Sequence, residues 1–193
     1  MARPQVFNQQ QVISKALECF WLKGYSATSL SELLTAMNIS RSTLYNSFGD
    51  KRQLFEQCLQ VYSQQTQQVL SMTLMSEKCA TFEAIKQFLY LVLIAPNGEL
   101  SARGCLLVNT IAETAQTDPV LHRLSTGLML PVKLGFIHQL NKAFDEEASK
   151  QHGEWLFTQL LGWRLQCQMG LDKKKLENQI DWSLQQLKKQ SEL

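Results

Sequence analysis

The chain has 193 residues, 45% hydrophobic and 9% aromatic, which is enough to bury a sizeable core and excludes global disorder. Its formal net charge is +2, and this excess lies in residues 1–58, which carry six basic and four acidic side chains. So small an excess is compatible with nucleic-acid binding but does not establish it.

Glycine and proline are scarce, with 9 and 4 residues, and alternating strand-like segments are few, so we expect an all-α fold. The five cysteines form no C-x-x-C motif and have no metal-ligand spacing with histidine. We therefore expect no disulfide framework, metal ion or cofactor. The sequence shows neither a signal-peptide core nor an apolar run of about 18 residues, which predicts a cytoplasmic protein without membrane contact.

Three short helices are predicted in the first 50 residues, each with its own start and stop signal. The first begins near Asn8 and ends before Gly24. Ser29 caps the second, and the third spans Arg41 to about Phe48. Only about three residues join the second and third helices, which is typical of a helix-turn-helix DNA-binding motif.

Longer helices are expected in the rest of the chain, so we predict a DNA-binding domain over residues 1–50 and a second helical domain over 51–193. These helices are predicted over 51–75, 81–95, 101–116, 119–145, 154–169 and 172–189. Pro131 lies inside the fourth of them and predicts a kink or break near Leu130.

The third helix has the composition expected of a DNA-recognition helix. Leu44 and Phe48 provide the side that faces the domain, and Arg41 and Asn46 can form paired hydrogen bonds to guanine and adenine. The other polar residues of this helix near the groove or backbone are Ser42, Thr43 and Tyr45. Each residue alone also fits a helix cap, a solvated charge or a core position, so the hypothesis depends on their combined spacing.

The segments 24–33 and 38–51 together resemble the N-terminal domain of TetR-family regulators, and the resemblance spans residues 8–60. It extends more weakly to 103–110. It implies a homodimeric repressor that binds a palindromic double-stranded DNA operator and responds to a small-molecule effector. In this family Thr28, Ser29, Tyr45 and Lys51 would lie near DNA phosphates.

The resemblance also implies an effector pocket among the central helices and a dimer interface on the last two. The predicted interface residues are Leu156, Leu160, Trp163, Ile180, Leu184 and Leu187. The candidate pocket residues are Phe88, Cys105, Leu107, Met129, Phe136, His138 and Trp163, each of which also fits an ordinary structural position.

Two residues suggest more specific roles. Cys105 follows Arg103 near the start of a helix, where a guanidinium and the helix dipole could activate the thiol toward oxidants or electrophiles. The alternative is a small buried apolar residue. Arg3 could enter a minor groove from an N-terminal arm, or belong to a disordered tail.

The predicted function is transcriptional repression released by a small-molecule or thiol-reactive effector. The alternatives are an activator, an effector-independent regulator, or a small all-α ligand-binding protein. We do not expect an enzyme, because the sequence contains no G-x-S-x-G, P-loop or H-E-x-x-H motif. The effector, the operator sequence and the target genes stay open.

Overall fold

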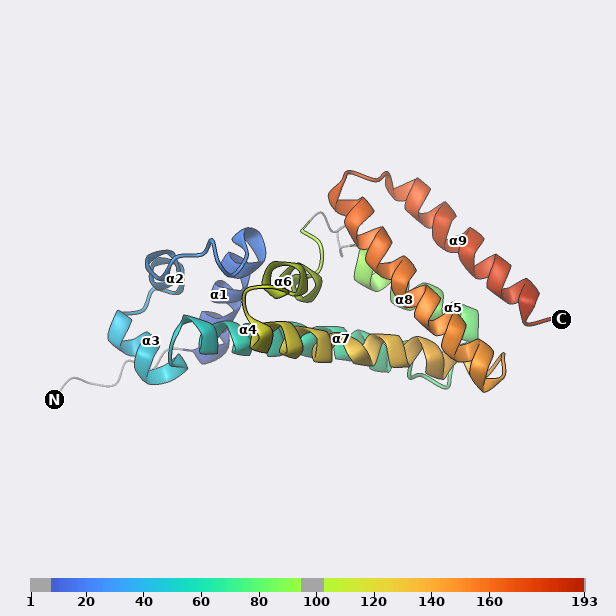
Figure 1. The fold of residues 1–193 in the computed structure, drawn as a ribbon, viewed down its shortest axis with the longest axis horizontal. Helices are drawn as coiled ribbons and strands as arrows, with labels where there is room; N and C mark the ends of the chain where they lie inside the picture. Colours follow the sequence, from blue (N-terminus) through green and yellow to red (C-terminus); the bar gives the residue numbers. More distant parts are fainter. Residues whose placement is uncertain (1–7, 95–102, 193) are drawn as a thin grey trace.

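The computed structural model describes residues 8–94 and 103–192, and its regular elements over these ranges are helices (Figure 1). They are α1 (Gln9–Lys23), α2 (Leu30–Met37), α3 (Arg41–Phe48), α4 (Lys51–Met72), α5 (Thr81–Leu93), α6 (Leu106–Thr114), α7 (Pro119–Leu140), α8 (Glu146–Gln168) and α9 (Lys173–Gln190). The expected all-α fold is confirmed. Arg3 lies outside the described residues, and no helix within them is long and apolar enough to cross a membrane.

Local capping forms the three short helices at the N-terminal end, as the sequence predicts. The Asn8 side chain accepts a hydrogen bond from the Gln10 backbone amide at 3.0 Å, and Ser40 accepts one from Thr43 at 3.1 Å. Ser29 and Glu32 form a reciprocal capping box at α2. Asn38 then ends α2 in the left-handed conformation, with φ of 55°, which a short asparagine side chain tolerates.

Helix α4 connects the two ends of the molecule, and α7 lies against it (Figure 1). Phe55 near the start of α4 packs in the N-terminal core, whereas Leu70 near its end belongs to the C-terminal core, which also includes residues of α5, α7, α8 and α9. Helix α7 also packs in both cores, with Leu121 in the N-terminal core and Phe136 in the C-terminal core. Packing is therefore continuous across residue 50, and the domain division at that position stays a prediction.

Helices α7 and α8 differ from the predicted ones. No break occurs at Pro131, and α7 continues to Leu140. Proline removes one backbone donor, but its would-be acceptor, the Gly127 carbonyl, lies on an exposed turn where water can bind it. The final pair begins earlier than expected, because Asp145 accepts a hydrogen bond from the Ala148 amide at 2.8 Å and so starts α8.

Gly153 allows α7 and α8 to approach each other closely. A Cβ atom at this position would lie 2.5 Å from Cγ1 of Ile137 and 3.1 Å from its backbone nitrogen. The two helices can keep this separation only if position 153 has no side chain. Gly127 on α7 offers a matched control, because a Cβ there would meet no atom within 4 Å.

We predict that Gly153→Ala lowers the free energy of unfolding by about 1–3 kcal/mol, because the added methyl group forces α7 and α8 apart. Gly127→Ala should raise it by about 0.5–1 kcal/mol, since alanine favours the helix at a position with free space. Urea denaturation followed by circular dichroism measures both values. Equal effects of the two substitutions would contradict the close approach.

Candidate nucleic-acid interface and ligand cavity

Helix α3 presents a polar face to solvent at the end of the molecule opposite α9 (Figure 1). Leu44 and Phe48 are buried against the other N-terminal helices, with exposed fractions of 0% and 2%. The side chains exposed on its other face are Arg41, Ser42, Tyr45, Asn46 and Ser47. Tyr45 is 51% exposed and is not a core residue. The helix therefore combines an apolar anchor with a row of exposed hydrogen-bonding groups.

Three further predicted contact residues lie at helix starts. Ser29 is exposed, and its hydroxyl donates to Glu32 at 2.8 Å. The half-buried Thr43 has its hydroxyl 2.8 Å from that of Ser40. The Lys51 ammonium lies 4.5 Å from the centre of the Tyr25 ring, and partial burial lowers its pKa, with Glu113 opposing that shift.

Thr28 is a correction to the predicted set. Its side chain is fully buried, and its hydroxyl donates a hydrogen bond to the Gly24 carbonyl at 2.6 Å. It thereby closes the turn between α1 and α2, so it cannot contact a phosphate in this conformation. Sequence reasoning missed this because a threonine just before a helix looks like an exposed cap residue.

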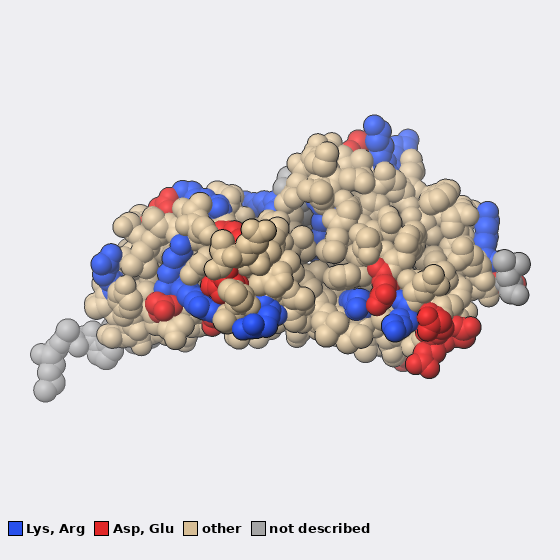
Figure 2. Space-filling model, in the orientation of Figure 1, with Lys and Arg blue, Asp and Glu red and all other residues tan. Residues whose placement is uncertain are grey.

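The charge around the interface is mixed. In the view of Figure 2, Lys and Arg side chains at the N-terminal end alternate with Asp and Glu. Glu32 pairs with Lys23, and this contact, together with the hydrogen bonds from Ser29, lowers the pKa of Glu32 to about 2. Its negative charge persists at neutral pH beside the start of α2. Any recognition of DNA here depends more on directed hydrogen bonds than on a uniform positive field.

The six predicted interface residues of α8 and α9 are another correction, because they pack inside the chain. Leu156, Leu160, Trp163, Ile180, Leu184 and Leu187 are at most 6% exposed and belong to the C-terminal core. The large apolar side chains exposed on these helices or directly after α8 are instead Leu165, Met169 and Trp182, at 58%, 78% and 62%. The periodicity of the sequence correctly predicted an apolar face on each of these helices. It did not show that helices of the same chain, and not a second subunit, cover that face.

Most of the predicted pocket residues are core or surface residues. Phe88 and Phe136 pack edge to face with ring centres 5.5 Å apart, and Leu107 and Trp163 are also core residues. The ring of His138 lies near the surface, with Nε2 3.5 Å from a Glu77 carboxylate oxygen. The role of these five residues in an effector pocket stays a prediction. Met129 instead lines a separate apolar groove among α6, α7 and α8.

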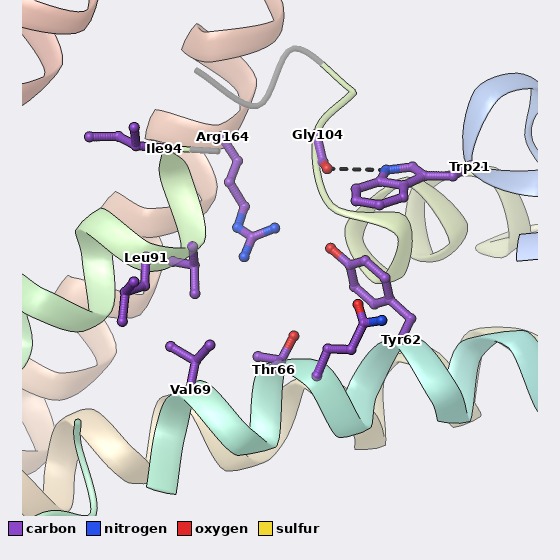
Figure 3. A pocket seen from close by; sticks show the side chains of 10 residues that line it. Trp21, Tyr62, Thr66, Val69, Leu91, Ile94, Gly104 and Arg164 are labelled. Carbon is purple, nitrogen blue, oxygen red and sulfur yellow. Dashed lines mark hydrogen bonds between the residues drawn. The ribbon is translucent and has the colours of Figure 1, made fainter. Parts of the chain in front are cut away.

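A cavity of about 270 Å³ lies between α1, α4, α5 and α8 (Figure 3). Its lining residues are Trp21, Tyr62, Gln65, Thr66, Val69, Leu91, Val92, Ile94, Gly104 and Arg164. The Trp21 indole donates a hydrogen bond to the Gly104 carbonyl at 3.2 Å across its edge. No predicted pocket residue lines this cavity, although Cys105 adjoins it and is only 2% exposed.

Arg164 is the most unusual lining residue, because only 8% of it is exposed and its Nε has no hydrogen-bond partner among the described residues. Burial opposes its charge, but interactions with Cys105 and Tyr62 outweigh that effect and raise the pKa of Arg164. Sequence reasoning missed the residue. The available signal was a lone cation inside the apolar run 160–165 of a predicted core helix.

Several polar contacts join the N-terminal helices to α6 and α7. The Glu113 carboxylate on α6 accepts hydrogen bonds from the backbone amides of Tyr25 and Ser26, at 3.0 and 2.6 Å. Arg52 on α4 forms an ion pair with Asp118 at 3.4 Å. A displacement of α6 relative to α4 would therefore pull on the turn that precedes α2.

Comparison with known proteins relates the chain to bacterial regulators. Residues 12–58 match the family described as "Bacterial regulatory proteins, tetR family". The chain is 29% identical over 146 residues to an uncharacterized HTH-type transcriptional regulator, YezE, of Bacillus subtilis, covering 76% of this chain and 75% of YezE. It is also 29% identical over 107 residues to the HTH-type transcriptional repressor ComR of Escherichia coli, covering 55% of this chain and 51% of ComR.

The fold is shared with solved structures of such regulators. A cysteine mutant of the TetR family transcriptional regulator CifR, complexed with 26bp double-strand operator DNA, superposes with a TM-score of 0.77. The superposition covers 95% of this chain and 98% of CifR at 20% sequence identity. These relatives are transcriptional regulators and not enzymes. The family match assigns residues 12–58 to the tetR family of bacterial regulatory proteins, and the chain as a whole is similar in sequence and fold to such transcriptional regulators.

Proposed function

We propose that the chain is a homodimeric repressor that binds a palindromic double-stranded DNA operator through α3 and is released by a small-molecule effector. The observation that supports this most is the exposed polar face of α3 on a buried Leu44 and Phe48 anchor. The operator-bound structure of CifR, which shares the fold, adds support. Repression needs no contact beyond the operator, because a bound dimer can occlude a promoter.

On this proposal, some side chains of α3 contact bases and others contact the DNA backbone. Arg41 and Asn46 form paired hydrogen bonds to base edges in the major groove, and Tyr45 donates to a phosphate. Ser29 at the start of α2 and Lys51 at the start of α4 add backbone contacts, since exposed amides at helix starts attract anions. Ser42 and Thr43 lie at the first turn of α3, within reach of the backbone or the groove.

We predict that Arg41→Ala weakens operator binding by about 1–3 kcal/mol and relaxes sequence preference at one position, because it removes a base contact. Tyr45→Phe should weaken binding similarly at every operator sequence. Gel-shift titration on an operator selected from random DNA measures both. Lys150→Ala removes an exposed charge on α8 and serves as control. Unchanged affinity of both α3 variants would exclude α3 as the DNA-contacting helix.

Dimerisation would use the face of α8 and α9 that this chain leaves uncovered. Leu165 on α8, Met169 directly after α8 and Trp182 on α9 are large apolar side chains that are more than half exposed. Gly162, one turn before Leu165 and Gln166 on α8, has open space where a side chain would be. A second helix could approach closely at that point, and two-fold symmetry would match a palindromic operator.

We predict that Leu165→Glu shifts the protein from dimer to monomer while its helix content stays unchanged, because a charge would be buried at the interface. Sedimentation velocity at micromolar concentration measures the shift. Leu22→Glu introduces the same charge at a residue of α1 that is 65% exposed and provides the matched control. A Leu165→Glu protein that stays dimeric would place the interface elsewhere.

Cys105 supports a second candidate signal, oxidation or alkylation of its thiol. The guanidinium of Arg164 interacts with this residue, in place of the Arg103 guanidinium expected from the sequence. Cys105 directly follows the cavity-lining Gly104 in the chain. Its 2% exposure means that a reagent must enter through the cavity or an opening of the structure.

If Cys105 is the sensor, a quinone, aldehyde or hypochlorite should release the protein from its operator, and Cys105→Ser should abolish that release. Cys79→Ser changes a partly exposed thiol before α5 and is the control. Fluorescence anisotropy of labelled operator DNA follows the release. A Cys105→Ser protein that responds like the parent would eliminate this candidate.

A further inference from the structure

The guanidinium of Arg164 reaches from α8 into the cavity, between Leu91 of α5 and Tyr62 of α4 (Figure 3). Its Nε is shielded from solvent and has no hydrogen-bond partner among the described residues. Among residues 8–94 and 103–192, no carboxylate forms an ion pair with it. The cavity therefore contains a positive charge that the described residues do not neutralise.

Burying the Arg164 charge in this way lowers the stability of the folded chain, so stability does not explain why arginine is at this position. A buried charge without a counter-charge loses its hydration, so arginine is rarely this buried unless it is paired. Arg164 cannot lose its proton to escape the cost, because the pKa of a guanidinium is too high and its neighbours raise it further, despite burial. An anion bound in the cavity would supply the missing partner.

The remaining walls indicate what kind of anion fits. Val69, Leu91, Val92 and Ile94 provide an apolar surface, and Trp21 adds an aromatic ring at the edge. Gln65 and Thr66 on α4 can offer further hydrogen bonds. A single cation beside an apolar wall suits a singly charged planar group on an apolar body better than a doubly charged phosphate.

We propose that this cavity binds a small organic monocarboxylate, with the carboxylate paired to Arg164 and the apolar part against α5 and the end of α4. The proposal deepens the effector role in the proposed function, and only its regulatory consequence rests on that function. A ligand in this position contacts α4 and, through Trp21, α1. Its binding energy is thus available to shift the helices that carry α3.

Calorimetric titration of the full chain with matched pairs of probes tests the proposal. The pairs are benzoate and benzamide, phenylacetate and phenylacetamide, and octanoate and octanamide, with inorganic phosphate as a further anion. At least one carboxylate should bind at least about tenfold more tightly than its amide and than phosphate, because only it combines charge with an apolar body. Arg164→Met should abolish that difference, and Arg123→Met, which changes an exposed arginine on α7, should keep it.

A measurement without ligand complements the titration. Arg164→Met replaces an unpaired buried charge by an apolar side chain of similar length, so the ligand-free variant should melt at or above the temperature of the parent. A variant that melts well below the parent, or fails to fold, would show that Arg164 is structural and would overturn the proposal. Arg164→Lys, which keeps the charge, should retain part of the preference for carboxylates.

The outcomes separate this inference from the proposed function. Equal binding of acids and amides, tighter binding of phosphate, or no binding by any carboxylate overturns the monocarboxylate site. Carboxylate binding that depends on Arg164 but leaves operator affinity unchanged supports the site and contradicts its role in release. A protein that binds carboxylate but no selected DNA contradicts the proposed function alone.

Discussion

The shared packing of α4 in two cores is the constraint on which the rest of the structure depends. Phe55 stacks with Tyr25 and lies against Phe20 in the N-terminal core, while Leu70 of the same helix packs in the C-terminal core. Because interiors are close-packed, α4 cannot shift in one core without a response in the other. The position of α3 is therefore tied to the C-terminal helices through one continuous element.

The cavity lies beside the middle of α4, between the two parts of this helix that pack in the two cores. Tyr62, Gln65, Thr66 and Val69 line it from the middle of α4, between the parts that enter each core. Glu113 and the Arg52–Asp118 pair form a second, polar connection to the N-terminal helices. A charged ligand at Arg164 would change the contacts of the middle of α4, the helix that both cores share.

The sequence was most informative where structure is local. The caps at Asn8, Ser29 and Ser40 depend on residues two or three positions apart, so the three short helices could be placed correctly. Residues such as Leu160 and Ile180 have a clear helical period, but the period cannot distinguish a partner subunit from a neighbouring helix of the same chain. The cavity was missed for the same reason: Arg164 and Trp21 meet only after folding.

On the proposed function, two copies of this chain read DNA with α3 helices that their cores hold a fixed distance apart. Hydroxyl-radical footprinting on an operator selected from random DNA tests it most directly. We expect two protected patches on one face of a palindrome, centred about 10 base pairs or ~34–36 Å apart, one turn of B-DNA. A single protected half-site, or half-sites whose spacing varies among selected sequences, would contradict the claim.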